Sequence, residues 1–155
     1  MRSVRLDSTP FRADPDAPAG FRAGLIRPGG DFGARHSSVS YYEVPPGEAV
    51  CPYHYEYGEE EWAMALDGPM WVRDPDGVHR VEPLELVFFP RGPEGAHQVR
   101  NDGDTVVHVV MWGEMGDVGA TAYPDSDKVA AWTGVDGEEG IFVRSTRVDY
   151  YHGEL

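Results

Sequence analysis

Apolar residues occur along this chain in short runs, and glycine, proline or acidic residues separate one run from the next. Runs of about four to eight residues bounded by such turn residues are typical of β-strands, and no long stretch shows the period of a helix. Many short strands of this kind predict an all-β protein with an antiparallel β-barrel or jelly roll. The expected strands cover 23–27, 38–44, 50–56, 62–66, 70–73, 78–81, 84–90, 98–100 and 105–112.

The two ends of the chain carry weaker patterns. Several prolines among residues 1–20 predict an extended arm there rather than a helix. Beyond the last of these strands we expect a loop over 113–119, a helical turn or edge strand over 129–132, and a final strand over 142–148.

A chain of 155 residues is long enough for one domain with a sizeable core, and the sequence contains no internal repeat that would indicate a second barrel. We divide it into an N-terminal extended arm with the first strand (1–35), the barrel core (36–115) and a C-terminal extension packed on the barrel (116–155).

The stretch from Gly47 to Gly68 concentrates the candidate chemistry. His54 and Glu56 are two residues apart, so on a strand their side chains project from one face, while Cys51 points to the other. A turn then lets the chain reverse, and the acidic triplet that ends at Glu61 delivers a further carboxylate into the next strand.

A second stretch, 88–101, supplies His97 directly after a turn rich in glycine and proline. His54, Glu56, Glu61 and His97 can therefore converge from two hairpins. Imidazole nitrogen and carboxylate oxygen together suit Fe(II), Mn(II), Zn(II) or Ni(II), so we expect a divalent metal ion as the cofactor.

These two stretches resemble the two sequence motifs of the cupin family. In the first, His54-x-Glu56 is followed after four residues by Glu61 and after six more by Gly68. In the second, Pro90-x-Gly92 is followed after four residues by His97 and after three more by Asn101.

The chain departs from the family pattern in four places. The spacer after Gly47 is one residue longer than usual, Glu56 replaces the family's second histidine, Leu84 replaces the opening glycine of the second motif, and two residues are inserted before His97. The resemblance covers roughly residues 39–112 and implies a cupin-type barrel. It does not imply one reaction, because a single fold hosts many activities.

Two roles are open for Glu56. If it coordinates the metal, the site contains two histidines and two carboxylates, which is a harder and formally neutral set. If it stands off, His54, Glu61 and His97 form a two-histidine, one-carboxylate set with open positions, and Glu56 becomes a candidate catalytic general base. Glu60 competes with Glu61 as the ligand, but the spacing to Gly68 favours Glu61.

Several neighbouring residues have a weaker assignment. Ala63 and Ala65 share a strand face with Glu61 and would leave volume for a small molecule beside the site. His108 shares its parity with Val106 and Val110, which predicts that it faces the interior. Arg91 precedes the loop of His97 and is a candidate contact for an anionic substrate, although a surface position is the commoner outcome for an arginine.

The formal charge of -14 argues against nucleic acid and anionic membranes as partners, since both require a basic patch. One cysteine excludes an internal disulfide, and the N-terminal sequence lacks the apolar run of a secretion signal. These features predict a soluble, cytoplasmic protein, and the resemblance to cupins implies a homodimer.

We therefore expect a metal-dependent enzyme acting on a small organic metabolite, of oxygenase, isomerase, cyclase or lyase type. The alternative is a non-catalytic cupin that binds a small ligand or a metal.

Overall fold

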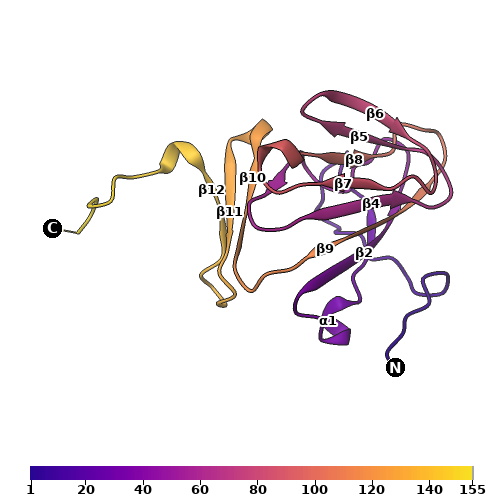
Figure 1. Ribbon diagram of the computed structural model, residues 1–155, viewed down its shortest axis with the longest axis horizontal. Helices are drawn as coiled ribbons and strands as arrows, with labels where there is room; N and C mark the ends of the chain where they lie inside the picture. Colours follow the sequence, from indigo (N-terminus) through magenta and orange to yellow (C-terminus); the bar gives the residue numbers. More distant parts are fainter. Residues whose placement is uncertain (155) are drawn as a thin grey trace.

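The computed structural model describes residues 1–154, and antiparallel strands form almost all of its regular structure (Figure 1). The strands are β1 (Gly24–Ile26), β2 (Ser37–Val44), β3 (Tyr55–Glu56), β4 (Glu61–Ala65), β5 (Met70–Asp74), β6 (Gly77–Val81), β7 (Val87–Phe89), β8 (Gln98–Arg100), β9 (Val107–Glu114), β10 (Gly119–Tyr123), β11 (Lys128–Trp132) and β12 (Gly140–Val143). The helical elements are short: α1 (Gly29–Phe32), η1 (Pro93–Gly95), η2 (Pro124–Ser126) and η3 (Arg144–Thr146).

Two sheets make the barrel. A five-stranded sheet has the order β1-β2-β9-β4-β7, and a three-stranded sheet has the order β6-β5-β8. One cluster of buried apolar side chains draws on both sheets, including Val44 and Val109 from the first and Met70 and Val99 from the second. The predicted all-β, jelly-roll fold is therefore confirmed.

The longest pairing joins β2 to β9 over the whole length of both strands, and it decides which face of β9 is buried. Val107 and Val109 point into the core, so His108, which lies between them, points outward. The prediction that His108 faces the interior is wrong for this reason. His108 instead stacks on Tyr41, and Phe11 of the N-terminal arm packs against both rings.

The predicted strand over 50–56 is regular only at its end, in β3. Ala49 pairs with Arg100 and His54 with His97. Between these two pairs, the segment 49–54 contains two more residues than the facing segment 97–100. Pro52 lies within this excess and has no N–H for a ladder hydrogen bond. The result is a bulge, and the simple alternation of faces fails across it.

The C-terminal part contains a third sheet, with the order β12-β11-β10-β3. The expected loop over 113–119 is shorter than predicted, because β9 continues to Glu114 and β10 begins at Gly119. The stretch 129–132 lies in β11, and the predicted last strand is β12 followed by η3. Beyond η3 the chain runs away from the body of the molecule (Figure 1).

The N-terminal 20 residues contain no helix and only one bridge, between Arg12 and Leu25, as expected for an extended arm. Among the residues that the structure describes, no helix has the length and apolar character needed to cross a membrane.

Candidate metal centre

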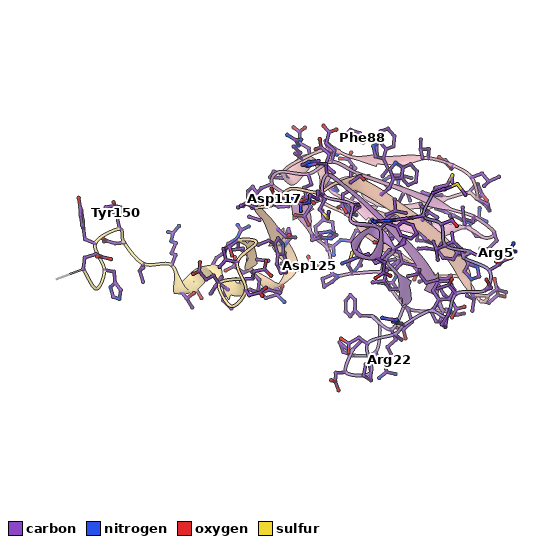
Figure 2. The ribbon with its side chains drawn as sticks, turned by 90° about the horizontal axis from the view of Figure 1, so that it is seen from below. Arg5, Arg22, Phe88, Asp117, Asp125 and Tyr150 are labelled. Carbon is purple, nitrogen blue, oxygen red and sulfur yellow. The ribbon has the colours of Figure 1, made fainter. Side chains whose placement is uncertain are left out.

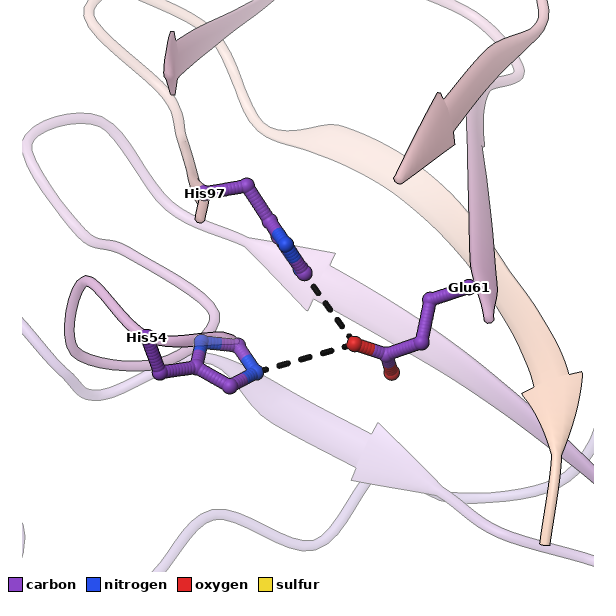
Figure 3. Close-up of side chains that lie close together, drawn as sticks. All are labelled: His54, Glu61 and His97. Carbon is purple, nitrogen blue, oxygen red and sulfur yellow. Dashed lines mark ion pairs between the residues drawn. The ribbon is translucent and has the colours of Figure 1, made fainter. Parts of the chain in front are cut away.

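Three of the predicted site residues, His54, Glu61 and His97, lie close together with their side chains pointing toward one another (Figure 3). His54 lies just before β3, Glu61 begins β4, and His97 lies between η1 and β8. Glu61 Oε2 is 3.7 Å from His54 Nε2 and 3.5 Å from His97 Nε2. One potential ligand atom from each residue lies within 4.8 Å of the others, which is close enough for all three to hold one ion.

Backbone carbonyls fix the orientation of both imidazole rings. His54 Nδ1 donates to the Pro52 carbonyl at 3.0 Å, and His97 Nδ1 donates to the Gly95 carbonyl at 2.9 Å. Because a carbonyl only accepts, the neutral ring keeps its hydrogen on Nδ1 and directs the lone pair of Nε2 into the cluster. This is the arrangement that metal-binding histidines commonly show.

The loop that carries His97 is tightly closed. A Cβ atom at Gly95 would lie 1.6 Å from the carbonyl oxygen of Pro90, so glycine alone fits at this position. On its other side the His97 ring stacks on Phe89, with ring centroids 3.7 Å apart and planes 7° from parallel. The His97 side chain is therefore held in one position.

Two atoms of the cluster lack a hydrogen-bond partner among the residues that the structure describes. They are Glu61 Oε2 and His97 Nε2, and both are buried. A buried polar atom without a partner costs about 1–3 kcal/mol, so such atoms normally belong to a site that takes up a ligand or an ion. Here the two atoms face each other, and the donor set fits a divalent cation.

The charges in the metal-free cluster are strongly linked. Burial opposes a charge on His54, but Cys51 and Glu61 outweigh it and raise the pKa of His54. Burial and the adjacent His54 lower the pKa of His97 to about 4. Burial also opposes the charge on Glu61, but the two histidines hold its pKa below the usual range. In the metal-free cluster His54 therefore carries an additional proton beside a neutral His97 and an ionised Glu61, and a metal ion would displace that proton.

Glu56 lies at the margin of this cluster. Its Oε1 is 3.9 Å from His54 Nε2, and it is not one of the residues whose ligand atoms converge within 4.8 Å. The Thr121 hydroxyl lies 2.9 and 2.7 Å from the two carboxylate oxygens and donates to them, while Trp132 Nε1 donates to the same hydroxyl at 2.9 Å. Burial raises the pKa of Glu56 to about 7, so this carboxyl can hold or release a proton near neutral pH.

A cavity of about 330 Å³ opens beside the cluster, a size suited to a small molecule. His54, Glu56 and Glu61 line it together with side chains from β2, β9, β10 and β11. Ala63 and Ala65 are not among the lining residues, contrary to prediction. Both are completely buried in the barrel core, because β4 runs from Glu61 away from the cavity into the apolar cluster.

Other predicted residues lie elsewhere. Cys51 lines the cavity, 3.5 Å from His54 Nδ1, although strand alternation placed it on the opposite face; the bulge at Pro52 explains the difference. Glu60 is exposed at the surface. Arg91 is also exposed and forms an ion pair with Glu114 outside the cavity.

Sequence reasoning missed the contributions of the C-terminal sheet. Thr121 and Trp132 reach the site because β10 pairs with β3, which places Thr121 directly opposite Glu56. No motif marks either residue. A threonine between two alanines in β10 was the only sequence signal, and it does not reveal the partner strand.

A comparison with protein families found that residues 40–113 match the cupin domain. A comparison with curated proteins found no match.

Solved structures with the same fold include a sugar phosphate isomerase of the cupin superfamily from Silicibacter pomeroyi. It is 21% identical, the match covers 94% of each chain, and the TM-score is 0.79. The polyketide cyclase RemF from Streptomyces resistomycificus is 21% identical over 74% of this chain and 79% of its own, with a TM-score of 0.60. A Cupin 2 conserved barrel domain protein from Salinispora arenicola is 23% identical over 73% of this chain and 87% of its own, with a TM-score of 0.52. At these identities the likeness shows the fold alone.

Proposed function

The chain belongs to the cupin family, and from that premise we propose that it is a metal-dependent enzyme acting on a small organic molecule in the barrel cavity. One observation carries the proposal. His54, Glu61 and His97 direct three ligand atoms to one point, and two of those atoms are buried without a partner in the described structure. A barrel that served only as a scaffold would gain nothing from this costly arrangement.

The metal is Fe(II), Mn(II), Zn(II) or Ni(II), the ions that two imidazoles and one carboxylate suit. When held by His54, Glu61 and His97, it would supply Lewis-acid chemistry beside the cavity. An isomerase and a cyclase are among the proteins that share the fold, and the reaction classes we propose are oxygenase, isomerase, cyclase and lyase.

Glu56 is the proposed catalytic residue. It lines the cavity and stands beside His54, and Thr121 fixes its direction. Its pKa of about 7 suits a general base that removes a proton from a bound substrate and returns it. We assign it this role rather than that of a fourth metal ligand, because its carboxylate is already held by Thr121.

Elemental analysis of protein purified without chelators or a metal-affinity tag tests the proposal. We expect near-stoichiometric metal in the wild type and in Glu56→Gln, and its loss in His97→Ala. If metal falls in Glu56→Gln as well, Glu56 is a ligand. A wild type that takes up no divalent ion even after reconstitution would leave the alternative, a cupin that binds a small ligand without catalysis.

We also propose that the protein forms a homodimer through its C-terminal part. Edge strand β12 exposes Phe142 at 56%, and Tyr150 is exposed at 87% in the segment that leaves the body (Figure 2). A free sheet edge with exposed apolar side chains is a ready site for pairing with another chain. Light scattering should find a dimer that Tyr150→Ser with Tyr151→Ser weakens; a monomeric wild type would refute the proposal.

A further inference from the structure

One wall of the cavity has a chemistry that metal binding does not use. Ser38, Ser40 and Tyr42 alternate along β2 and therefore share a face, and all three line the cavity. Arg27, the residue after β1, lines it with them. This wall therefore carries three hydroxyl groups and one guanidinium group.

Arg27 is the only lysine or arginine among the residues that line this cavity in the described structure. Its Nε donates to Ser40 Oγ at 3.3 Å, which orients the guanidinium beside the hydroxyls of Ser40 and Tyr42. No carboxylate of residues 1–154 lies within ion-pair distance of it, whereas Arg91 is paired with Glu114 and Arg73 with Asp125.

The rest of the cavity has the opposite charge. Glu56, Glu59 and Glu61 all line it, in a chain whose net charge is -14. Among the side chains that line the cavity in the described structure, only Arg27 offers an anionic molecule a permanent positive charge. The charge of Arg27 also reaches the metal cluster, since it is one of the cations that lower the pKa of Glu61 against burial.

We infer that Arg27, with the hydroxyls of Ser40 and Tyr42, forms a subsite for a carboxylate or phosphate group of the substrate. A guanidinium presents paired N–H donors that match two oxygens of either group, and the neighbouring hydroxyls add single donors. With its anionic group held on this wall, the rest of a small molecule extends through the same cavity toward His54 and Glu61. The inference rests on the proposed function and narrows its substrate class to organic anions.

The test is a binding measurement that needs no knowledge of the reaction. Calorimetry on zinc-loaded protein would use succinate and inorganic phosphate as probes, with the neutral diamide of succinate as a control for shape. The variants are Arg27→Gln, Arg27→Lys and Arg91→Gln. The last is a matched control because it removes the same charge from an arginine outside the cavity.

We expect the wild type to bind at least one anion and not the diamide. Arg27→Gln should weaken that binding about tenfold or more, because a hydrogen-bonded ion pair is worth about 1.5–3 kcal/mol. Arg27→Lys should retain part of it, and Arg91→Gln should stay within about twofold of the wild type. A preference for succinate over phosphate would assign a carboxylate substrate, and the reverse a phosphorylated one.

Equal anion binding by the wild type and Arg27→Gln would overturn the inference, as would a loss in Arg91→Gln of the same size. Zinc content is measured for every sample, so the two proposals fail separately. A wild type that takes up no zinc refutes the metal-dependent function, while the comparison of Arg27→Gln with wild type in metal-free protein still decides the role of Arg27. Loss of zinc from Arg27→Gln without an effect on anions would show that Arg27 only supports the cluster.

Discussion

Two clusters of histidine and carboxylate among residues 1–154 have opposite character. The inner cluster joins His54, Glu61 and His97, and the outer cluster joins His108 with Asp67 and Glu43. The side chain of His97 is 1% exposed and that of His108 is 26% exposed.

The difference lies in what holds each ring. In the outer cluster Asp67 Oδ2 lies 2.5 Å from His108 Nδ1, so the carboxylate itself satisfies the imidazole. In the inner cluster backbone carbonyls take the Nδ1 hydrogens. The Glu61 carboxylate faces both Nε2 atoms at 3.5 Å or more, and its Oε2 and the Nε2 of His97 have no hydrogen-bond partner in the described structure. A metal site is therefore recognised by the ligand atoms that remain unused, rather than by the residue types it contains.

Removing one histidine from each cluster gives the largest contrast. His97→Ala should weaken zinc affinity at least about 100-fold, since loss of a residue that only supports a ligand already costs about 10–100-fold. His108→Ala should leave affinity unchanged. Zinc titration with a competing chelator measures both, and equal affinities in the two variants would erase the distinction between the clusters.

Chelation extends the contrast to stability. A ligand present at 1,000 times its Kd stabilises the folded state by about 4 kcal/mol, so a chelator should lower the Tm of the zinc-loaded wild type by about 10 °C. His108→Ala should show the same shift and His97→Ala almost none. Calorimetric scans with and without chelator measure this decrease in Tm. An equal decrease in His97→Ala would mean that the ion binds at another site.

The raised pKa of Glu56 should make the stability of the metal-free protein depend on pH, and this effect is smaller than that of chelation. The carboxyl has a pKa of about 7 in the folded state against an ordinary 4.5, so the unfolded chain loses this proton first and stability falls as pH rises from 4.5 to 7. The lowered pKa of His97 acts in the opposite direction from pH 4 to 6.5 and partly hides the trend. His97 is present in both wild type and Glu56→Gln, so the difference between their free energies of unfolding isolates the contribution of Glu56.

Between pH 4.5 and pH 7 the wild type should lose about 2–3 kcal/mol of stability relative to Glu56→Gln. Urea unfolding at a series of pH values is the measurement. A difference that stays constant with pH would mean that Glu56 is already ionised at pH 5.

The outer cluster should give the smallest effect. Its carboxylates are well exposed, Asp67 at 50%, and exposed ion pairs contribute about 0–1 kcal/mol. A double-mutant cycle of His108→Gln and Asp67→Asn should yield a coupling energy of about 0.5 kcal/mol by urea unfolding. A coupling above about 2 kcal/mol would give this pair a structural importance that its exposure does not suggest.

The barrel and the convergence of the inner cluster could both be predicted from the sequence, because both depend on local rules. Strand alternation and turn residues fix where Glu61 begins β4, and the loop rich in glycine and proline sets where His97 enters β8. The motif spacing separated Glu61 from Glu60, and the structure places the first in the cluster and the second at the surface.

Features that depend on register between distant segments could not be predicted. The bulge at Pro52 turned Cys51 into the cavity, and the start of β9 at Val107 turned His108 outward. Thr121 meets Glu56 across 65 residues of sequence, through a strand pairing that no local pattern specifies. Arg27 likewise becomes a cavity residue only when β1 pairs with β2.

The closed loop at Gly95 has a consequence for protein engineering. Since any side chain there would collide with the Pro90 carbonyl, and since the Gly95 carbonyl itself orients His97, a mutational library of this loop should be nearly empty of functional variants at Gly95. Arg91 and Glu94, exposed in the same loop, should tolerate most replacements. Attempts to change the reaction are therefore better directed at the cavity wall than at this loop.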